Sequence, residues 1–495
     1  MPLTSFHVHE TTIQATQAAL LAGQVTCVQL AEQYLARIAA YDVAGPGLNA
    51  MLAINPALMQ EAAALDHARR AAPQDLPPLH GVAVAVKDNL NLRGLPTTGG
   101  VRALADLRAR HDAFVVARLR AAGAMIIGKT NLHEFALAGL TVSSLKGQTR
   151  NPYELGRTPG GSSGGSGVAV AASLALVGIG TDTGQSIRSP ASALALVGLR
   201  PTRGLVSRGG VMPGSVTQDT VGPLARTAED AARLLDAIAG FDVDDPSSAA
   251  CVGQVPASYT AQLKGDALAG ARIGVLRQMF GTEDRHAEVN RVVLAAADAM
   301  AGLGATLLDI NVPELDALTA DQVTADYEMR AAFDRYLAGM DTTAATRSLE
   351  AIVAGGDFHP SVAANLRAAL DGQGMADPAY AQIFVRRDQL RTALLLVMAR
   401  HQLDAILYPH QKILVVPVDA EAQTERNGVL SNATGMPAIS FPAGFSAPNE
   451  QAPAGVPIGV ELLGRDWSEA RLLAYAHAFE LATRTRVPPF STPRL

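Results

Sequence analysis

Short apolar runs alternate with longer amphipathic segments along most of the chain. The short runs predict buried strands, and the amphipathic or alanine-rich segments predict helices. The predicted strands are 82–86, 124–128, 174–180, 272–276, 306–310, 405–408, 438–441 and 458–463. The predicted helices are 12–41, 61–71, 113–122, 132–138, 291–303, 385–400 and 467–483. This alternation of strand and helix predicts an α/β fold whose sheet is covered by helices on both faces.

Two segments depart from the alternation. Residues 315–402 contain few strand-like runs and are predicted to be mostly helical. Residues 444–457 are rich in proline and glycine, which predicts a surface loop. We find no internal repeats.

The composition predicts a folded protein with a large core. The 495 residues are 48% hydrophobic and 17% charged, and the formal net charge is −6. That charge gives no electrostatic reason to expect nucleic acid or an anionic membrane as a partner. No window approaches the ~20 apolar residues of a membrane span, and no signal peptide is evident at the N-terminus. The two cysteines cannot form a disulfide framework, so we expect a cytoplasmic location.

Metal chemistry has no support in the sequence. His7, His9 and Glu10 lie close together, but such histidines near a chain end are usually only solvated. Neither HExxH nor CxxC spacing occurs. We therefore expect no metal and no cofactor.

The segment 159–190, PGGSSGGSGVAVAASLALVGIGTDTGQSIRSP, is the richest in candidate chemistry. Two serines in glycine-rich turns, Ser162 and Ser186, flank a small apolar stretch, and Lys87 ends the earlier run GVAVAVK. Serine is a weak nucleophile until a base removes its proton. Glycine turns let amide N–H groups approach one substrate oxygen closely.

These residues, together with blocks in the same order elsewhere, resemble the amidase signature family of serine hydrolases. The blocks that carry the resemblance are LAGQVTCVQLAEQYLARIAAYD (21–42), VAVKDNL (84–90), TTGG (97–100), GKTNLHEFA (128–136), the segment 159–190, GLRPTRGLVSRGG (198–210), TQDTVGPLARTAEDAA (217–232) and NATGMPAISFPAG (432–444). They cover nearly the whole chain. The resemblance implies one domain over 1–495, built on a large mixed β-sheet between helical layers. It also implies that the insertion at about 315–402 forms part of a substrate pocket wall.

The resemblance implies a catalytic triad. Ser186 would be the nucleophile and Ser162 the bridging serine, on an unusual cis peptide bond with Gly161. Lys87 would be the base. A lysine acts as a base only when it is neutral, and burial on a strand of apolar residues would lower its pKa in that direction.

Thr183, Gly184, Gln185 and Ser186 form a turn after a predicted strand. Successive amide N–H groups there can form an oxyanion hole, and Ala136 is a further candidate for substrate binding. Supporting positions are Gly161, Ser163, Asp182 and Arg188, of which the last two are expected to form an ion pair or hydrogen-bonded brace.

Three departures from the family pattern are visible. Gln185 stands where most relatives have glycine, and Arg200 where lysine is common. Residues 408–412 replace a Thr-rich or Ala-rich turn, which suggests a specialised pocket rim.

Other interpretations of the glycine-rich block are weaker. A flexible linker is disfavoured because structured segments flank the block. Residues 160–164 fit G-x-S-x-G, the nucleophile elbow of α/β-hydrolases, but Arg157-Thr158-Pro159 is a poor end for the strand that the elbow needs. A phosphate loop is excluded because GxxxxGK[ST] is absent.

The sequence favours a free-standing hydrolase that cleaves the C–N bond of a carboxamide, anilide or carbamate through a serine acyl-enzyme. The expected partner is this small-molecule substrate, without nucleic acid or membrane, and the protein would be a monomer or homodimer. The alternative is the catalytic A subunit of a glutamyl-tRNA amidotransferase complex. An esterase-like or non-catalytic relative is a third possibility.

Overall fold

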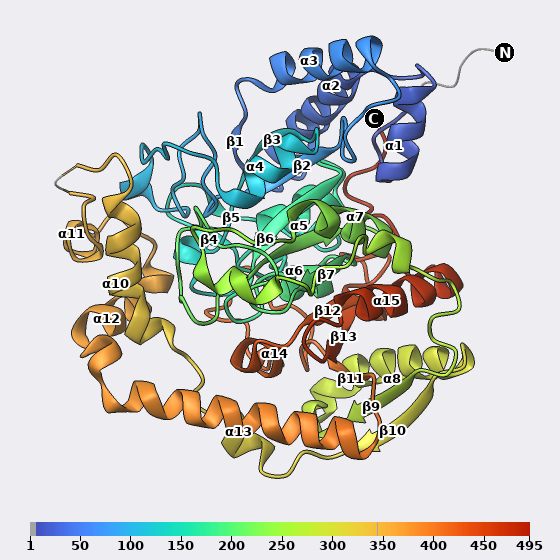
Figure 1. Cartoon of the computed structure of the whole chain (residues 1–495), viewed down its shortest axis with the longest axis vertical. Coiled ribbons are helices and arrows are strands. Elements are labelled where there is room, and N and C mark those ends of the chain that lie inside the picture. The colour runs from blue at the N-terminus through green and yellow to red at the C-terminus, as the bar shows by residue number, and fades with distance from the viewer. Residues whose placement is uncertain (1–5, 344) are drawn as a thin grey trace.

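A mixed sheet of 11 strands runs through the middle of the molecule (Figure 1). The computed structural model describes residues 6–343 and 345–495. In spatial order the strands are β1 (Met51–Ile54), β3 (Met125–Thr130), β2 (Ala83–Lys87), β6 (Val177–Thr181), β8 (Val221–Ala225), β7 (Val197–Arg200), β12 (Ala438–Phe445), β13 (Pro457–Gly464), β11 (Ala405–Pro409), β9 (Arg272–Leu276) and β10 (Thr306–Ile310). A separate pair, β4 (Val142–Ser143) and β5 (Gly147–Gln148), forms a small two-stranded sheet.

Helices cover the sheet and extend beyond it. They are α1 (Ile13–Leu21), α2 (Cys27–Arg37), α3 (Leu58–Ala71), α4 (Phe114–Ala121), α5 (Gly164–Ala171), α6 (Arg188–Ala193), α7 (Ala228–Ile238), α8 (Ala287–Gly302), α9 (Leu315–Thr319), α10 (Ala325–Ala338), α11 (Leu349–Gly355), α12 (Ala363–Asp371), α13 (Pro378–Arg400), α14 (Val429–Thr434) and α15 (Glu469–Thr483). In the described part of the chain, no helix combines the length and the apolar character needed to cross a membrane.

Strand β11 shows how the sheet separates two cores. Ala405 and Leu407 belong to the large core that also contains apolar residues of α8 and α15. Ile406 and Tyr408 belong to a second core, which contains apolar residues of α13 and α14. Successive side chains of a strand point to opposite faces, so this strand is covered on both sides. The expected mixed sheet between helical layers is confirmed.

The parallel part of the sheet positions the chemistry. Strand β2 pairs in parallel with β3 and with β6. Lys87 is the last residue of β2 and Thr181 is the last residue of β6. The C-terminal ends of these two strands therefore lie side by side, at the kind of edge where open α/β sheets bind their ligands.

Side-chain caps explain where several helices begin. The Thr26 hydroxyl accepts a hydrogen bond from the Gln29 amide, and the Gln29 side chain accepts one from the Thr26 amide, which forms a capping box before α2. The Thr227 hydroxyl caps α7 by accepting from the Asp230 amide. Asp377 caps α13, and a proline at the first helical position fits because it has no N–H to satisfy.

Between residues 315 and 402 the chain forms α9 to α13, seen in yellow and orange beside and below the sheet in Figure 1. Apolar residues of α10, α11 and α12 form a third core together with residues from outside this segment, and in it Phe333 of α10 meets Phe135 edge-to-face at 5.5 Å between ring centres. Residues 319–326 reach the pocket described below. The assignment of the whole chain to one domain stays a prediction.

Two predicted elements were wrong, and three strands of the large sheet were missed. The segment 12–41 forms two helices because the chain turns at Gly23, whose φ is +69°. The predicted helix at 132–138 is only a short 3-10 turn over Glu134–Ala136, because Phe135 and Ala136 have φ of +55° and +61°. The missed strands are β1, β7 and β8. Each has only four or five residues, and β7 and β8 contain glycine or proline, which weakens a strand signal.

Candidate active site

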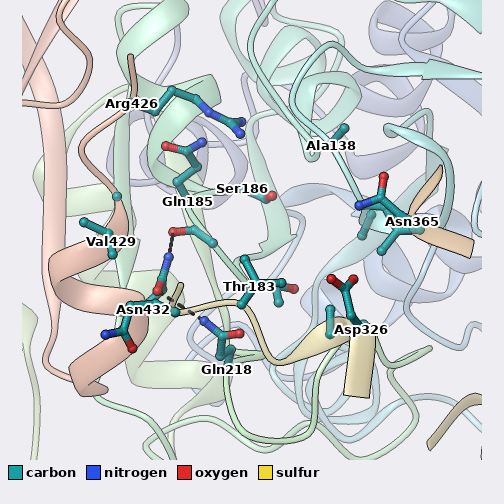
Figure 2. Close-up of a pocket in the computed structure, with 18 of the residues that line it drawn as sticks. Ala138, Thr183, Gln185, Ser186, Gln218, Asp326, Asn365, Arg426, Val429 and Asn432 are labelled. Atoms are coloured by element: carbon teal, nitrogen blue, oxygen red, sulfur yellow. Dashed lines mark hydrogen bonds between the residues drawn. The ribbon is translucent and has the colours of Figure 1, made fainter. Parts of the chain in front are cut away.

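A pocket of about 540 Å³ opens beyond the C-terminal end of β6 (Figure 2). Ser186 lies on its wall, with 7% of its surface exposed. The lining combines the turn after β6 with more distant segments. These residues are Ala136, Leu137, Ala138, Thr183, Gly184, Gln185, Ser186, Gly214, Gln218, Thr319, Asp321, Gln322, Val323, Ala325, Asp326, Asn365, Arg426, Gly428, Val429 and Asn432.

Lys87 lies fully buried behind this wall. Its Nζ is 2.7 Å from the Ser162 Oγ and 2.7 Å from the Thr181 Oγ1. Burial lowers the pKa of Lys87 to about 7, although the negative charges of Asp182 and Asp219 act in the opposite direction. Near neutral pH a large fraction of this amine is therefore uncharged and able to accept a proton.

The Ser162 loop is held against the Ser186 turn. The Gly161–Ser162 peptide bond is cis. The Ser163 amide donates to the Ser186 carbonyl at 3.2 Å, and the Ser163 hydroxyl donates to the Thr181 carbonyl at 3.1 Å. A Cβ at Gly161 would lie 2.7 Å from the Thr141 Oγ1, so this position has no room for a side chain. The structure thus brings Lys87 and both serine turns together.

Hydrogen bonds fix the direction of two carbonyl groups in the turn after β6. The Gly184 carbonyl accepts from the Arg188 Nη2 and from the Asn432 Nδ2, both at 2.8 Å, and Figure 2 shows the second bond. The Gln185 carbonyl accepts from the Ser189 amide at 2.8 Å. A trans peptide directs its N–H away from its carbonyl, so the Gln185 and Ser186 amides point the other way.

These amides have no acceptor of their own. Within residues 6–343 and 345–495, no hydrogen bond uses the amide N–H of Thr183, Gly184, Gln185 or Ser186. Buried amides without partners are rare in proteins. Free amides beside a serine in a pocket are the donor set that an oxyanion requires.

A buried ion-pair network braces the same turn. Asp182 pairs with Arg188 at 3.1 Å and with Arg200 at 2.8 Å, and all three side chains are completely buried. Burial alone would raise the pKa of Asp182, but the two guanidinium groups hold it well below its usual range. The expected brace between Asp182 and Arg188 is therefore present, and Arg200 belongs to it as well.

The brace continues to the other half of the sheet. Arg188 also donates to Glu461 of β13 at 2.6 Å, and Glu461 accepts from the Tyr408 hydroxyl at 2.8 Å. The His410 Nδ1 lies 2.6 Å from the second Glu461 oxygen. Tyr408 and His410 are completely buried and do not line the pocket, so the prediction that 408–412 forms its rim was wrong.

Gln185 turns its side chain away from the nucleophile. The Gln185 amide faces Arg426, and its oxygen is assigned to that side because the opposite orientation sets the amide NH2 against the guanidinium N–H groups; so assigned, the oxygen accepts from the Arg426 Nε and Nη1. Figure 2 shows the Gln185 side chain directed toward Arg426, while the Ser186 hydroxyl points in a different direction. Ala136, the other predicted substrate-binding residue, lies in the pocket lining.

Sequence reasoning missed several residues of the site. The Thr183 hydroxyl donates to Asp219 at 2.5 Å, and Asp219 also accepts from the Gly214 amide at 2.9 Å. Burial raises the pKa of Asp219. Asp219 lies in the family-like block 217–232. That block pointed to the segment, but it did not predict the hydrogen bond between Asp219 and Thr183. No sequence motif around Arg426 or Glu461 indicates a functional role.

The structure offers little to the alternative chemistries. Among the described residues, no group of three or more His, Cys, Asp or Glu side chains is arranged to hold a metal ion. Within that same part of the chain, no histidine side chain is hydrogen-bonded to the Ser162 hydroxyl, as an α/β-hydrolase elbow would require. The pKa of His133, which lies nearby, is lowered to about 3 by burial and by the charges of His359, Arg426 and Lys87.

The family follows from a direct comparison. The amidase family model matches residues 29–473, so the chain belongs to the amidase signature family and is an enzyme that acts on C–N bonds.

Relatives within this family have different roles. The chain is 37% identical over 93% of its length to the glutamyl-tRNA(Gln) amidotransferase A subunit of Synechococcus sp. (strain CC9311), of which 95% is covered. It is 36% identical to the native peptide amidase of Stenotrophomonas maltophilia, with a TM-score of 0.88 over 99% of this chain and 100% of that one. It is 25% identical to the solved glutamyl-tRNA(Gln) amidotransferase A subunit of Thermotoga maritima, with a TM-score of 0.74 over 98% of each chain.

Proposed function

We propose that this protein hydrolyses amides through an acyl-enzyme on Ser186, with Ser162 and Lys87 as a proton relay. The observation that carries the proposal is the Lys87 Nζ at 2.7 Å from the Ser162 Oγ, fully buried behind a pocket whose wall includes Ser186. A base, a hydroxyl that can pass a proton and a nucleophile at a pocket are the parts that serine acylation requires.

We infer the following steps, in which a proton passes between the Ser162 and Ser186 hydroxyls. Neutral Lys87 takes the proton of the Ser162 hydroxyl, and Ser162 takes the proton of Ser186. The Ser186 oxygen then attacks the carbonyl carbon of the amide. When the C–N bond breaks, the proton returns through Ser162 to the departing amine. Water releases the acid from Ser186 by the same steps.

The turn after β6 supplies the stabilisation of charge in this scheme. The free amides of Thr183, Gly184, Gln185 and Ser186 would donate to the negatively charged oxygen of the tetrahedral intermediate. Asp182 and Arg188 have a supporting role, because they fix the direction of these peptide groups without contacting the substrate. Gly161 and Ser163 position the Ser162 hydroxyl.

We further propose that the chain works as a free-standing hydrolase of a carboxamide, anilide or carbamate. The similarity in three dimensions supports this, because the TM-score to the peptide amidase is 0.88 and that to the Thermotoga maritima protein is 0.74. The active unit would be a monomer or homodimer in the cytoplasm, without a cofactor.

The second candidate is the A subunit of a glutamyl-tRNA amidotransferase. The 37% identity over 93% of the chain to the Synechococcus protein favours it. In that case the chain would release ammonia from glutamine, and it would need partner subunits and tRNA. The expectation that nucleic acid plays no part therefore depends on the free-standing assignment.

The experiment is a panel of primary amides, anilides, carbamates and esters, with glutamine included, incubated with the purified chain alone. Turnover of an amide or carbamate that is lost in Ser186→Ala supports the free-standing hydrolase. Hydrolysis of glutamine alone, and only after partner subunits are added, supports the second candidate. Absence of turnover on every substrate in both settings contradicts an amidase role.

A further inference from the structure

Arg426 is a cation in the pocket without an anionic partner. Its guanidinium contacts the Gln185 amide oxygen, and no carboxylate among the described residues forms an ion pair with it. A Cβ on Gly139 would lie 2.4 Å from the Arg426 Nη1, so the lack of a side chain at Gly139 provides space for the guanidinium. Arg426 lines the pocket and is exposed there, and desolvation by the surrounding protein atoms lowers its pKa to about 10.

Arginines that are buried elsewhere in this chain have partners that compensate their charge. Arg188 and Arg200 pair with Asp182. Arg37 donates to four backbone carbonyls. Removing a charge from water is costly unless hydrogen bonds or an opposite charge compensate. Arg426 differs because its guanidinium is exposed in the pocket, where a single neutral amide leaves its positive charge available to an anionic group that enters.

The donors that remain on Arg426 have a defined geometry. A guanidinium has five N–H groups. The Gln185 oxygen accepts one hydrogen bond from Nε and one from Nη1. This leaves one N–H group on Nη1 and two on Nη2 for a ligand. These form a planar fork that matches the two oxygens of a carboxylate.

The opposite wall of the pocket fixes the direction of such a ligand. Asp321 and Asp326 line that wall, and Figure 2 places Asp326 across the pocket from Arg426, beyond Thr183 and beside Asn365. Asp326 has no ion-pair partner among the described residues, and burial raises its pKa. An anionic group is repelled at that wall and attracted only at the Arg426 end.

We propose that Arg426 binds a carboxylate of the substrate, so that the preferred amide carries an anionic group close to the scissile bond. The distance must be short because Gln185, which holds the guanidinium, directly precedes the proposed nucleophile. The inference deepens the proposed function and rests on it in one respect, because it takes the bound carboxylate to be part of the substrate. The binding of the carboxylate itself does not depend on turnover.

The test measures binding to the Ser186→Ala protein by calorimetry with two matched pairs of probes. Succinamate is paired with 4-oxopentanamide, which places the charge in the acyl part. 4-Acetamidobenzoate is paired with 4-acetamidoacetophenone, which places the charge in the amine part. Each pair is measured again after the further changes Arg426→Gln, Arg426→Lys and Gly139→Ala. Arg110→Gln is the control, because Arg110 is exposed and pairs with Asp341 away from the pocket.

We expect the charged member of one pair to bind more tightly than its neutral partner by about tenfold to a hundredfold, as for hydrogen bonds to charged groups. Arg426→Gln should remove this preference, and Arg426→Lys should keep part of it. Gly139→Ala should weaken the preference by displacing the guanidinium, whereas Arg110→Gln should leave it intact. The pair that responds shows which part of the substrate carries the charge.

Equal affinity within both pairs, absence of binding by both charged probes, or a preference that survives Arg426→Gln would overturn the inference. A failure of the proposed function has a different signature. In that case the charged probe binds in an Arg426-dependent way to the Ser186-containing protein, but no amide or carbamate is turned over.

Discussion

The pKa of Lys87 makes the proposed relay testable through the pH dependence of activity. Only the neutral amine can take the proton of Ser162, and burial places the pKa of Lys87 at about 7. For a neutral anilide, kcat/KM should therefore rise with pH along a single ionisation with a midpoint near that value. About a tenth of the maximal rate should remain one pH unit below the midpoint, and about nine tenths should be reached one unit above it.

The same ionisation has a measurable cost in stability. The unfolded chain has a lysine pKa of 10.5, and the folded protein has one of about 7. Because the folded protein binds fewer protons between these values, its free energy of unfolding rises with pH across that window and the penalty is complete below it. At 1.36 kcal/mol per pKa unit, the penalty for charged Lys87 is about 5 kcal/mol.

The perturbation that exposes this cost is Lys87→Met, which keeps the length of the side chain and removes the charge. We expect the variant to lose nearly all turnover and yet to be more stable than the wild type at pH 6 by a few kcal/mol. The difference should shrink as the pH approaches 10. Urea unfolding at several pH values measures it. Lys129→Met is the control, because Lys129 is equally buried but pairs with Asp88 at 2.8 Å, so its loss should destabilise the protein.

Two results would refute this reasoning. A pH profile that is flat from pH 6 to 9, or maximal near pH 5, is incompatible with a lysine base of this pKa. A Lys87→Met protein that is less stable than the wild type at pH 6, and by the same amount at pH 9, would show that the buried amine does not carry the expected proton-linked cost.

Three further predictions concern the site. Ser186→Ala should abolish turnover in a folded protein, and the double variant with Lys87→Ala should be little worse than either single one, since residues that act as a unit give non-additive losses; multiplied losses in a kinetic comparison would contradict the relay. Gln185→Gly should keep most of kcat and change substrate preference, because the Gln185 side chain faces Arg426; a kcat loss of about 10²–10³ on several substrates would instead assign it an oxyanion contact. Overnight dialysis against a chelator should leave the rate unchanged, and a loss restored by zinc would disprove the metal-free scheme.

The sequence predicted the sheet better than the connections around it. Strands β9 and β10 were predicted to the residue, because short apolar runs flanked by polar residues leave little freedom in where a strand begins and ends. The helix expected at 132–138 failed for a reason that lies outside the local pattern. Glu134 accepts hydrogen bonds from the Ser144 and His359 amides, and such distant contacts hold the turn in a non-helical form.

The candidate site shows the same difference between residues that the sequence points to and residues that only distant contacts bring in. Lys87, Ser162 and Ser186 were predicted because each stands in a block that resembles the amidase signature family, and these predictions stay untested. Arg426 and Asp219 were not, because each meets the turn after β6 only through the folding of a distant loop. A single charged residue in a polar loop has no pattern that distinguishes a pocket cation from a solvated one.

The brace from Asp182 through Arg188 to Glu461 also constrains the order of events during synthesis. Arg188 and Glu461 are separated by 273 positions in the chain. A ribosome that has just made the nucleophile turn must still produce β13 before the second carboxylate reaches Arg188, and contacts of such long sequence separation form late in folding. The nascent chain therefore carries an incomplete site until its last strand emerges, and the onset of hydrolysis during translation would report completion of the whole sheet rather than folding of the first half.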